Sequence, residues 1–294
     1  MPNLRDIQRR ITSVENTQKI TSAMKMVSAA KLRRAQQAVE SARPYAQSMR
    51  GTLEAVAAGE SDAENPLLVA RERVAKLGIV VITSDRGLAG AFNSQVLKKA
   101  LALVKQRESK ADVSLYLLGR KAGDFFKKRW PDRIALKEVV GNQITYPQAA
   151  GIARQLARAF EAEELDEVVV VFNEFVTTMT QRPTVNQLLP IVATGAEEQS
   201  PEEGEGEEAT PYTIEPGAKQ LLATLAPKAL EVQVFQALLE NQAGEHAARM
   251  TAMENATRNS EDLIESLTLQ FNRARQAAIT RELVEIVTGA QALE

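Results

Sequence analysis

The C-terminal segment constrains the fold most strongly, because residues 228–288 contain no proline and a single glycine, Gly244. A helix rises about 1.5 Å per residue, so one helix over this range would run on the order of 90 Å. A compact chain of this length has a radius of gyration of about 19 Å and could not enclose such a helix. Apolar residues recur along its second half at spacings of three and four: Ile264, Leu267, Phe271, Ala274 and Ala278. This spacing predicts a seam that packs against a second helix.

The N-terminal segment supplies a partner for that seam. Residues 3–43 contain neither glycine nor proline, and Pro44 is expected in the last turns or at a kink. Two apolar stripes flank a polar interruption: Leu4, Ile7, Ile11 and Val14 before it, and Ile20, Ala23, Val27 and Ala30 after it. We expect both stripes to face the C-terminal helix in a coiled coil. We expect the two helices to be antiparallel, because the middle of the chain connects the end of the first helix to the start of the second. The periodicity itself does not give the direction.

The predicted N-terminal helix is basic. Residues 3–43 hold nine Lys or Arg residues and three acidic residues, a local net charge of +6. Such a face is commonly just solvated, but it could also bind phosphates or an acidic protein surface. A nucleic-acid-binding coiled coil is a further hypothesis, which the absence of interleaved stacking aromatic residues disfavours.

The middle of the chain alternates between apolar runs and helical patterns, which is typical of a parallel sheet with helical crossovers. Strands are predicted at 77–82, 113–118, 134–139 and 167–172, with a possible edge strand at 185–192, and helices at 94–105, 121–128 and 147–162. The predicted fold class is therefore α/β plus a long antiparallel coiled coil of the N- and C-terminal helices. Its centre is a small Rossmann-like, mostly parallel sheet covered by helices.

These patterns divide the chain into four expected segments. They are an N-terminal coiled-coil helix (1–57), a central α/β domain (75–193), an acidic flexible loop (194–216) and a C-terminal coiled-coil helix (217–294). Within the loop, residues 197–208 hold seven glutamates and no basic residue, which indicates a solvated surface segment and not a metal site.

The turn after the first predicted strand is where an open parallel sheet usually binds a ligand. Four of its residues are of the types found in such turns: Asp85, Arg86, Gly87 and Gly90. The stretch DRGLAG matches neither dinucleotide nor phosphate-loop patterns and has no lysine. We therefore expect a structural turn that needs glycine, and a nucleotide-binding α/β protein with helical arms stays the alternative.

Several chemistries are excluded by composition. The chain has no cysteine and a single histidine, so disulfides, thiolate nucleophiles, histidine triads and multi-histidine metal sites are not available. We expect no cofactor and no metal. No run of 18 apolar residues occurs, so any membrane contact is expected to go through a partner.

Four segments resemble signature segments of the gamma subunit of F-type ATP synthase. They are KITSAMKMVSAAKL (19–32), TSDRGLAGAFN (83–93), ENQAGEHAARMTAMENAT (240–257) and ARQAAITRELVEIV (274–287). These segments lie in both terminal helices and in the turn after the first predicted strand, and they occur in the same order as in the family. Residues 106–165 match by pattern only, and the acidic loop has no general counterpart. The cysteine-bearing regulatory insertion of the chloroplast members is absent.

The resemblance implies a rotor shaft with no active site of its own. One copy per complex would enter the ring of three alpha and three beta subunits and would bind the epsilon subunit and the membrane c-ring. It would transmit torque between proton flow and ATP synthesis or hydrolysis. It also implies no nucleic acid, membrane contact only through the complex, and a place on the cytoplasmic face of the bacterial plasma membrane.

The resemblance further implies contact residues for beta subunits. Met24 and Lys25 match the region near the acidic lever segment of beta, and Arg275 and Gln276 match a pair that hydrogen-bonds a beta loop. Three further residues belong to the same C-terminal segment: Thr280, Glu282 and Glu285.

Other positions match less directly. Arg281 stands where some relatives carry a neutral amide, which leaves its contact open. Tyr212 and Glu215, followed by Pro216, fall where the epsilon subunit is expected to pack.

Overall fold

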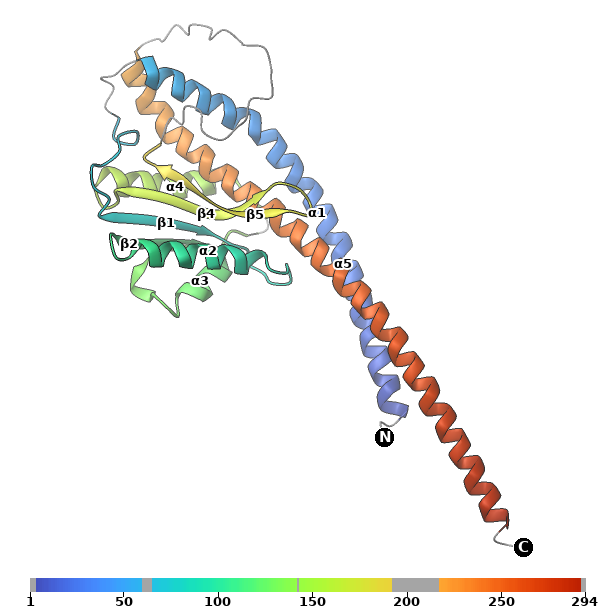
Figure 1. The fold of residues 1–294 in the computed structure, drawn as a ribbon. Coiled ribbons are helices and arrows are strands. Elements are labelled where there is room, and N and C mark those ends of the chain that lie inside the picture. The colour runs from blue at the N-terminus through green and yellow to red at the C-terminus, as the bar shows by residue number, and fades with distance from the viewer. Residues whose placement is uncertain (1–3, 60–64, 142, 192–216, 292–294) are drawn as a thin grey trace, which may run out of the picture. The chain divides into compact units, whose positions relative to one another are not determined.

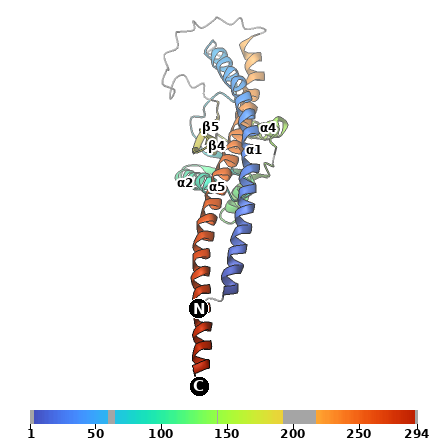
Figure 2. The ribbon, with the colours of Figure 1, turned by 90° about the vertical axis from the view of Figure 1, so that its right-hand side faces the viewer.

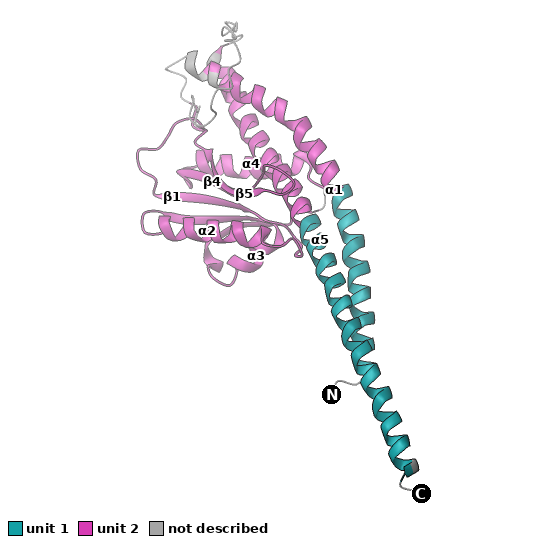
Figure 3. Ribbon diagram, turned by 45° about the vertical axis from the view of Figure 1, so that its right-hand side comes forward, with its two compact units in different colours: residues 1–30, 249–294 teal, residues 31–248 magenta. Residues whose placement is uncertain are grey.

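The structure is a computed structural model that describes residues 4–59, 65–141, 143–191 and 217–291. The chain forms two compact units (Figure 3). Unit 1 comprises residues 1–30 and 249–294, and unit 2 comprises residues 31–248. Two long helices, α1 (Leu4–Gly59) and α5 (Ala218–Gln291), each contribute to both units (Figure 1). The two long terminal helices predicted from the sequence are therefore confirmed.

Both long helices tolerate an internal proline. Pro44 lies inside α1 and Pro227 lies inside α5, although a proline removes one helical hydrogen bond. Packing in unit 2 accounts for this continuity, because Leu53 and Val56 of α1 and Leu230 of α5 are almost fully buried in one core. Tertiary contacts of this kind outweigh a local loss of helix propensity.

Unit 2 contains a five-stranded sheet in the order β3-β2-β1-β4-β5. The strands are β1 (Lys76–Ile82), β2 (Asp112–Leu118), β3 (Ile134–Glu138), β4 (Glu167–Phe175) and β5 (Gln181–Leu189). The first four are parallel, and β5 pairs with β4 in the antiparallel direction at the edge. The mostly parallel sheet and its predicted edge strand are thus confirmed.

Helices cover both faces of this sheet (Figure 1). One face packs on α2 (Phe92–Arg107) and α3 (Arg120–Phe126), and a short 3₁₀ turn (Pro131–Arg133) precedes β3. The opposite face packs on α4 (Tyr146–Glu161) and on the unit 2 portions of α1 and α5. A strand buried on both faces needs a continuous apolar run, which explains the sequence LGIVVI of β1.

A buried ion cluster joins α4 to α5 in unit 2. The Glu231 side chain is only 4% exposed. Its carboxylate accepts hydrogen bonds from the Tyr146 hydroxyl at 2.7 Å, Lys228 Nζ at 2.9 Å and Arg154 Nε at 3.0 Å. Burial alone would raise the pKa of Glu231, but these three donors together lower it below its ordinary value. The cluster therefore holds a charged carboxylate inside the unit.

We expect Glu231→Gln to destabilise the chain by about 1–2 kcal/mol at neutral pH, since it removes charge-assisted hydrogen bonds whose cations are partly screened by solvent. A lowered folded-state pKa gives stability above the unfolded pKa that is lost as pH falls through the folded pKa. The difference between the two proteins should therefore vanish in acid. Urea unfolding of both proteins at neutral and acidic pH measures this, and an equal difference at both would contradict it.

Candidate partner-binding site

The two helices of unit 1 meet along an apolar seam. Ile7 and Ile11 of α1 are buried together with Leu267 of α5. Val14, Phe271 and Ala274 pack against this cluster and are partly buried. The first predicted stripe is therefore confirmed at Ile7, Ile11 and Val14, and the C-terminal seam at Leu267, Phe271 and Ala274.

Polar contacts continue this interface along unit 1 and give its direction. Gln18 Nε2 donates to Glu261 Oε1 at 3.1 Å, the hydroxyls of Thr21 and Thr257 lie 2.8 Å apart, and Lys25 Nζ lies 3.2 Å from Glu254 Oε1. Residue numbers rise along α1 as they fall along α5, so the helices are antiparallel, as predicted. Both views show them side by side (Figures 1 and 2).

The expectation that the second stripe faces α5 was wrong. Ile20 and Val27 are 60% and 57% exposed, and Ala23 and Ala30 are also exposed. The seam keeps its spacing of three and four, and polar residues occupy it next: Gln18, Thr21, Lys25 and Ser28. A helix turns about 100° per residue, so a stripe two residues further along lies on the opposite face. Hydrogen bonds across the seam replace the apolar contacts that the sequence favoured.

Of the two residues proposed to face the beta lever, Lys25 is already engaged inside unit 1. Its ammonium pairs with Glu254, which Arg258 also contacts at 3.1 Å. The hydrogen bond from Lys25, helped by its charge, lowers the pKa of Glu254. Met24 is half-buried beside it, and its carbonyl accepts the Ser28 hydroxyl. A partner would contact Lys25 only by sharing or displacing this ion pair.

The C-terminal part of α5 presents the other proposed contact residues to solvent. Arg275, Gln276, Glu282 and Glu285 are exposed, and the exposed Thr280 donates its hydroxyl to the Gln276 carbonyl at 2.9 Å. Five large apolar side chains are exposed on the same turns: Ile279, Leu283, Val284, Ile286 and Val287. Exposed apolar side chains at this density mark a protein interaction surface. The sequence analysis identified the polar residues and missed these apolar ones. They could have been noticed because they continue past Ala278, where the predicted seam ends.

The turn after β1 is organised by Asp85. One carboxylate oxygen accepts the backbone N–H of Arg120 at 2.9 Å, and the other accepts that of Gly141 at 2.8 Å. Asp85 thereby ties the turn to the segments that follow β2 and β3. The turn is closed from the other side, where Asn93 hydrogen-bonds the backbone and hydroxyl of Ser84.

Glycine is needed at one of the two positions proposed in this turn. Gly90 adopts a left-handed φ of 56°, which favours glycine, and Leu88 adopts 62° with its side chain 64% exposed. A Cβ added at Gly87 would meet only Lys121 Cε at 3.9 Å, an ordinary contact. Arg86 is exposed, and its carbonyl accepts the Ser84 hydroxyl.

The proposed epsilon contacts at Tyr212 and Glu215, with Pro216 and the acidic loop 197–208, lie outside the described residues. Within the described ranges, no group of three or more His, Asp or Glu side chains is arranged to hold a metal ion. Among the helices in those ranges, none combines the length and apolar character needed to cross a membrane.

Comparison with known proteins gives one consistent family. A family model described as "ATP synthase" matches residues 3–293. Proteins called "ATP synthase gamma chain" are similar over 100% of both chains: 47% identity in Pelotomaculum thermopropionicum, 48% in Heliobacterium modesticaldum and 47% in Geobacter metallireducens.

Solved structures agree. A chain in the central stalk and c-ring structure of Tetrahymena thermophila mitochondrial ATP synthase is 25% identical, with a TM-score of 0.60. The match covers 81% of this chain and 99% of that one. A chain of the Euglena gracilis mitochondrial ATP synthase, in an assembly of OSCP, F1 and c-ring, has a TM-score of 0.68 at 22% identity, covers 99% and 94%, and supports the fold alone.

Proposed function

The chain belongs to the ATP synthase gamma chain family, and we propose that its two long helices act as the shaft that carries torque to the catalytic subunits. The observation that carries this proposal is the exposed end of α5, where five large apolar side chains follow Arg275 and Gln276 along the helix without burial in unit 1. A surface of this kind needs a surrounding partner. Nucleotide chemistry then belongs to the beta subunits, and this chain is a non-catalytic subunit.

The antiparallel pair in unit 1 suits a shaft. Torque on one helix passes to the other through the apolar cluster at Ile11 and Leu267 and through the cross-helix contacts at Thr21 and Thr257. Exposed charge pairs, each worth roughly 0–1 kcal/mol, suit the outer contacts with beta, because a rotor contact must form and release in each step.

The same proposal assigns the partners. Three alpha and three beta subunits would surround one copy of this chain, with the epsilon subunit and the c-ring as its other partners. The likeness to a chain in a "central stalk/cring" structure supports this assignment. Because the full-length relatives are bacterial, we place the complex on the cytoplasmic face of the plasma membrane. The division into segments 1–57, 75–193, 194–216 and 217–294 also stays a proposal.

The residue roles follow the family and are part of the proposal. The beta contacts would be made by Met24, Lys25, Arg275, Gln276, Thr280, Glu282 and Glu285, and the epsilon contacts by Tyr212 and Glu215. The five C-terminal residues of the beta set are exposed on α5, which supports their assignment as partner contacts. For Lys25, the contact would compete with Glu254.

A nucleotide site at the turn after β1 is the second candidate function, and the geometry does not favour it. Both carboxylate oxygens of Asp85 already accept backbone N–H groups, from Arg120 and Gly141. These hydrogen bonds support the role of a structural turn for Asp85, Arg86, Gly87 and Gly90. Binding of ATP or a dinucleotide to the purified chain at micromolar concentration would favour this alternative.

Co-assembly tests the proposed function. The chain is mixed with alpha and beta subunits from the same source, and the purified complex is assayed for composition and ATP hydrolysis. We expect one copy of this chain for three of each partner, and ATPase activity that depends on it. Failure to assemble where a known gamma subunit succeeds would contradict the proposal.

A disulfide across the shaft should leave rotation intact. The chain has no cysteine, so Thr21→Cys with Thr257→Cys adds the only pair, at positions whose hydroxyls are 2.8 Å apart. Because the two helices turn together, the oxidised complex should keep at least about half of the ATPase activity of the reduced one. A loss that dithiothreitol reverses would mean that the helices move against each other during turnover.

A further inference from the structure

A buried carboxyl group lies between α5 and the β4–β5 hairpin in unit 2. Glu240 is 6% exposed, and one of its oxygens accepts a hydrogen bond from Gln236 Nε2 at 3.0 Å. The backbone of Phe175, at the end of β4, also hydrogen-bonds it. Glu240 belongs to the segment 240–257 that the family resemblance singled out, yet the shaft role gives it no task.

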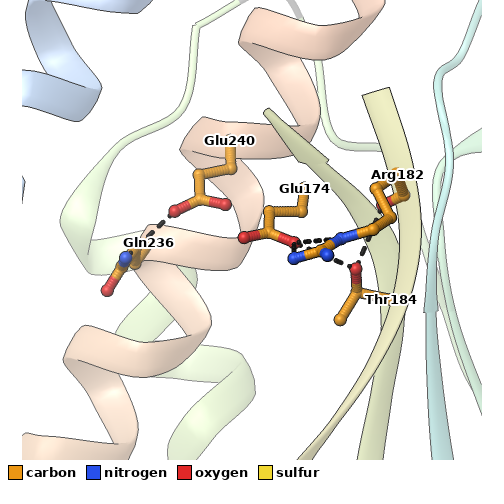
Figure 4. A network of polar contacts seen from close by, with 5 residues as sticks. All are labelled: Glu174, Arg182, Thr184, Gln236 and Glu240. Atoms are coloured by element: carbon orange, nitrogen blue, oxygen red, sulfur yellow. Dashed lines mark hydrogen bonds and ion pairs between the residues drawn. The ribbon is translucent and has the colours of Figure 1, made fainter. Parts of the chain in front are cut away.

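A second carboxyl group faces it from the sheet. Figure 4 shows the Glu174 carboxyl group of β4 pointing toward that of Glu240. Glu174 is itself held by β5, because one of its oxygens accepts Arg182 Nη2 at 2.8 Å, Arg182 Nε at 3.1 Å and the Thr184 hydroxyl at 3.2 Å. These three hydrogen bonds fix the direction of the Glu174 carboxyl group.

The groups around Glu240 only partly offset the cost of burying its negative charge. Burial is the largest influence and raises the pKa of Glu240, and the charge of Glu174 raises it further. Gln236 on α5, Arg43 on α1 and the Phe175 backbone act in the opposite direction without cancelling it. Arg182 on β5 is already bound to Glu174. Glu240 is buried while the Glu174 side chain is 34% exposed, so the cost of a second negative charge falls on Glu240, and Glu240 is the one that keeps a proton.

We propose that Glu240 and Glu174 form a proton-binding pair, with the proton on Glu240, that fastens α5 to the β4–β5 hairpin. Protonated Glu240 is neutral beside the anionic Glu174, and the helix packs on the hairpin. Loss of the proton leaves two negative charges facing each other and loosens this contact. The inference concerns contacts inside unit 2 and does not depend on the proposed rotor role.

The sign of the pH dependence follows from the raised pKa. A carboxyl group that binds its proton more tightly in the folded state adds stability below the unfolded pKa, and that stability is lost as pH rises through the folded pKa. Glutamine mimics the protonated form and cannot ionise. Glu240→Gln should therefore match the parent chain in acid and become increasingly more stable than it as pH rises, up to a plateau.

The test follows the ¹³C carboxyl resonances of glutamate-labelled full chain through a pH titration, together with its thermal unfolding midpoint. We expect one resonance, absent in Glu240→Gln, to titrate above the range of exposed glutamates. Glu174→Gln removes the facing charge and should shift that resonance to lower pH. The exposed Glu265 lies on the same helix, and Glu265→Gln, which removes the same charge, should leave the Glu240 titration unchanged.

Two results would overturn the proposal. One is a Glu240 resonance that titrates with the exposed glutamates. The other is a titration that does not move in Glu174→Gln. If Glu240→Gln does not fold, the parent chain and Glu174→Gln decide the question, because the resonance that shifts between them identifies the pair.

Discussion

ATP synthesis driven by a proton gradient should fall by about 10- to 100-fold when Arg275 and Gln276 are both replaced with alanine. On the proposed contact with a beta subunit, the variant removes one charge-assisted and one neutral hydrogen bond, together worth about 2 kcal/mol or more. Both side chains are exposed, so folding should change by no more than about 0.5 kcal/mol. Synthesis by the reconstituted complex and unfolding of the free chain measure the two effects separately.

A matched pair on the same helix provides the control. Gln270 and Arg273 carry the same two chemical groups and are also exposed. At about 100° per residue, Gln270 points roughly 120° or more away from both Arg275 and Gln276. Arg273 points roughly 160° away from Arg275 and roughly 60° away from Gln276. Gln270→Ala with Arg273→Ala should leave synthesis within about twofold of the parent. Unchanged ATP synthesis in the Arg275 and Gln276 variant would contradict the proposed contact of these residues with a beta subunit. An equal loss of synthesis in both variants would contradict it too.

The second large effect is expected at Gly119, which follows β2. Its φ of 99° is disfavoured for other residues, and an added Cβ would lie 2.3 Å from the Thr83 carbonyl oxygen. Thr83 cannot move away easily, because its N–H donates to Leu118 and its hydroxyl accepts the N–H of Ala122. We expect Gly119→Ala to destabilise unit 2 by about 3 kcal/mol or more.

Gly87→Ala is the control for that change, because its added Cβ makes only one ordinary contact. It should change the free energy of unfolding by less than about 1 kcal/mol. Urea unfolding of both variants, followed by circular dichroism, measures the difference. Equal stabilities would show that the segment around Gly119 relaxes around the added methyl group.

The strands could be predicted from the sequence because burial on both faces leaves few alternatives. Val80 and Ile82 point to one core and Ile79 and Val81 to the other, so the run reads as apolar throughout. Pro44 did not predict the end of α1 correctly. The helix continues to Gly59, because Leu53 and Val56 are buried in the core of unit 2.

The seam shows where apolar periodicity stops being informative. Ile20 and Val27 look like seam residues because they are apolar and have the expected spacing. Thr21 and Lys25 take the inward positions instead, because each contacts a polar residue of α5. Such pairs join residues more than 200 positions apart, and one sequence does not reveal them. Neither was the facing of Glu240 and Glu174 predictable, since it depends on how α5 packs on the hairpin.

Rotation of single complexes tests the central claim most directly. The exposed Lys99 of α2 can be replaced through Lys99→Cys, the only cysteine in the chain, and labelled with a gold particle in a complex whose beta subunits are fixed to a surface. If this chain is the shaft, the particle will turn in one direction in discrete steps when ATP is added and stop when ATP is removed. A complex that hydrolyses ATP while the particle stays fixed would contradict the account.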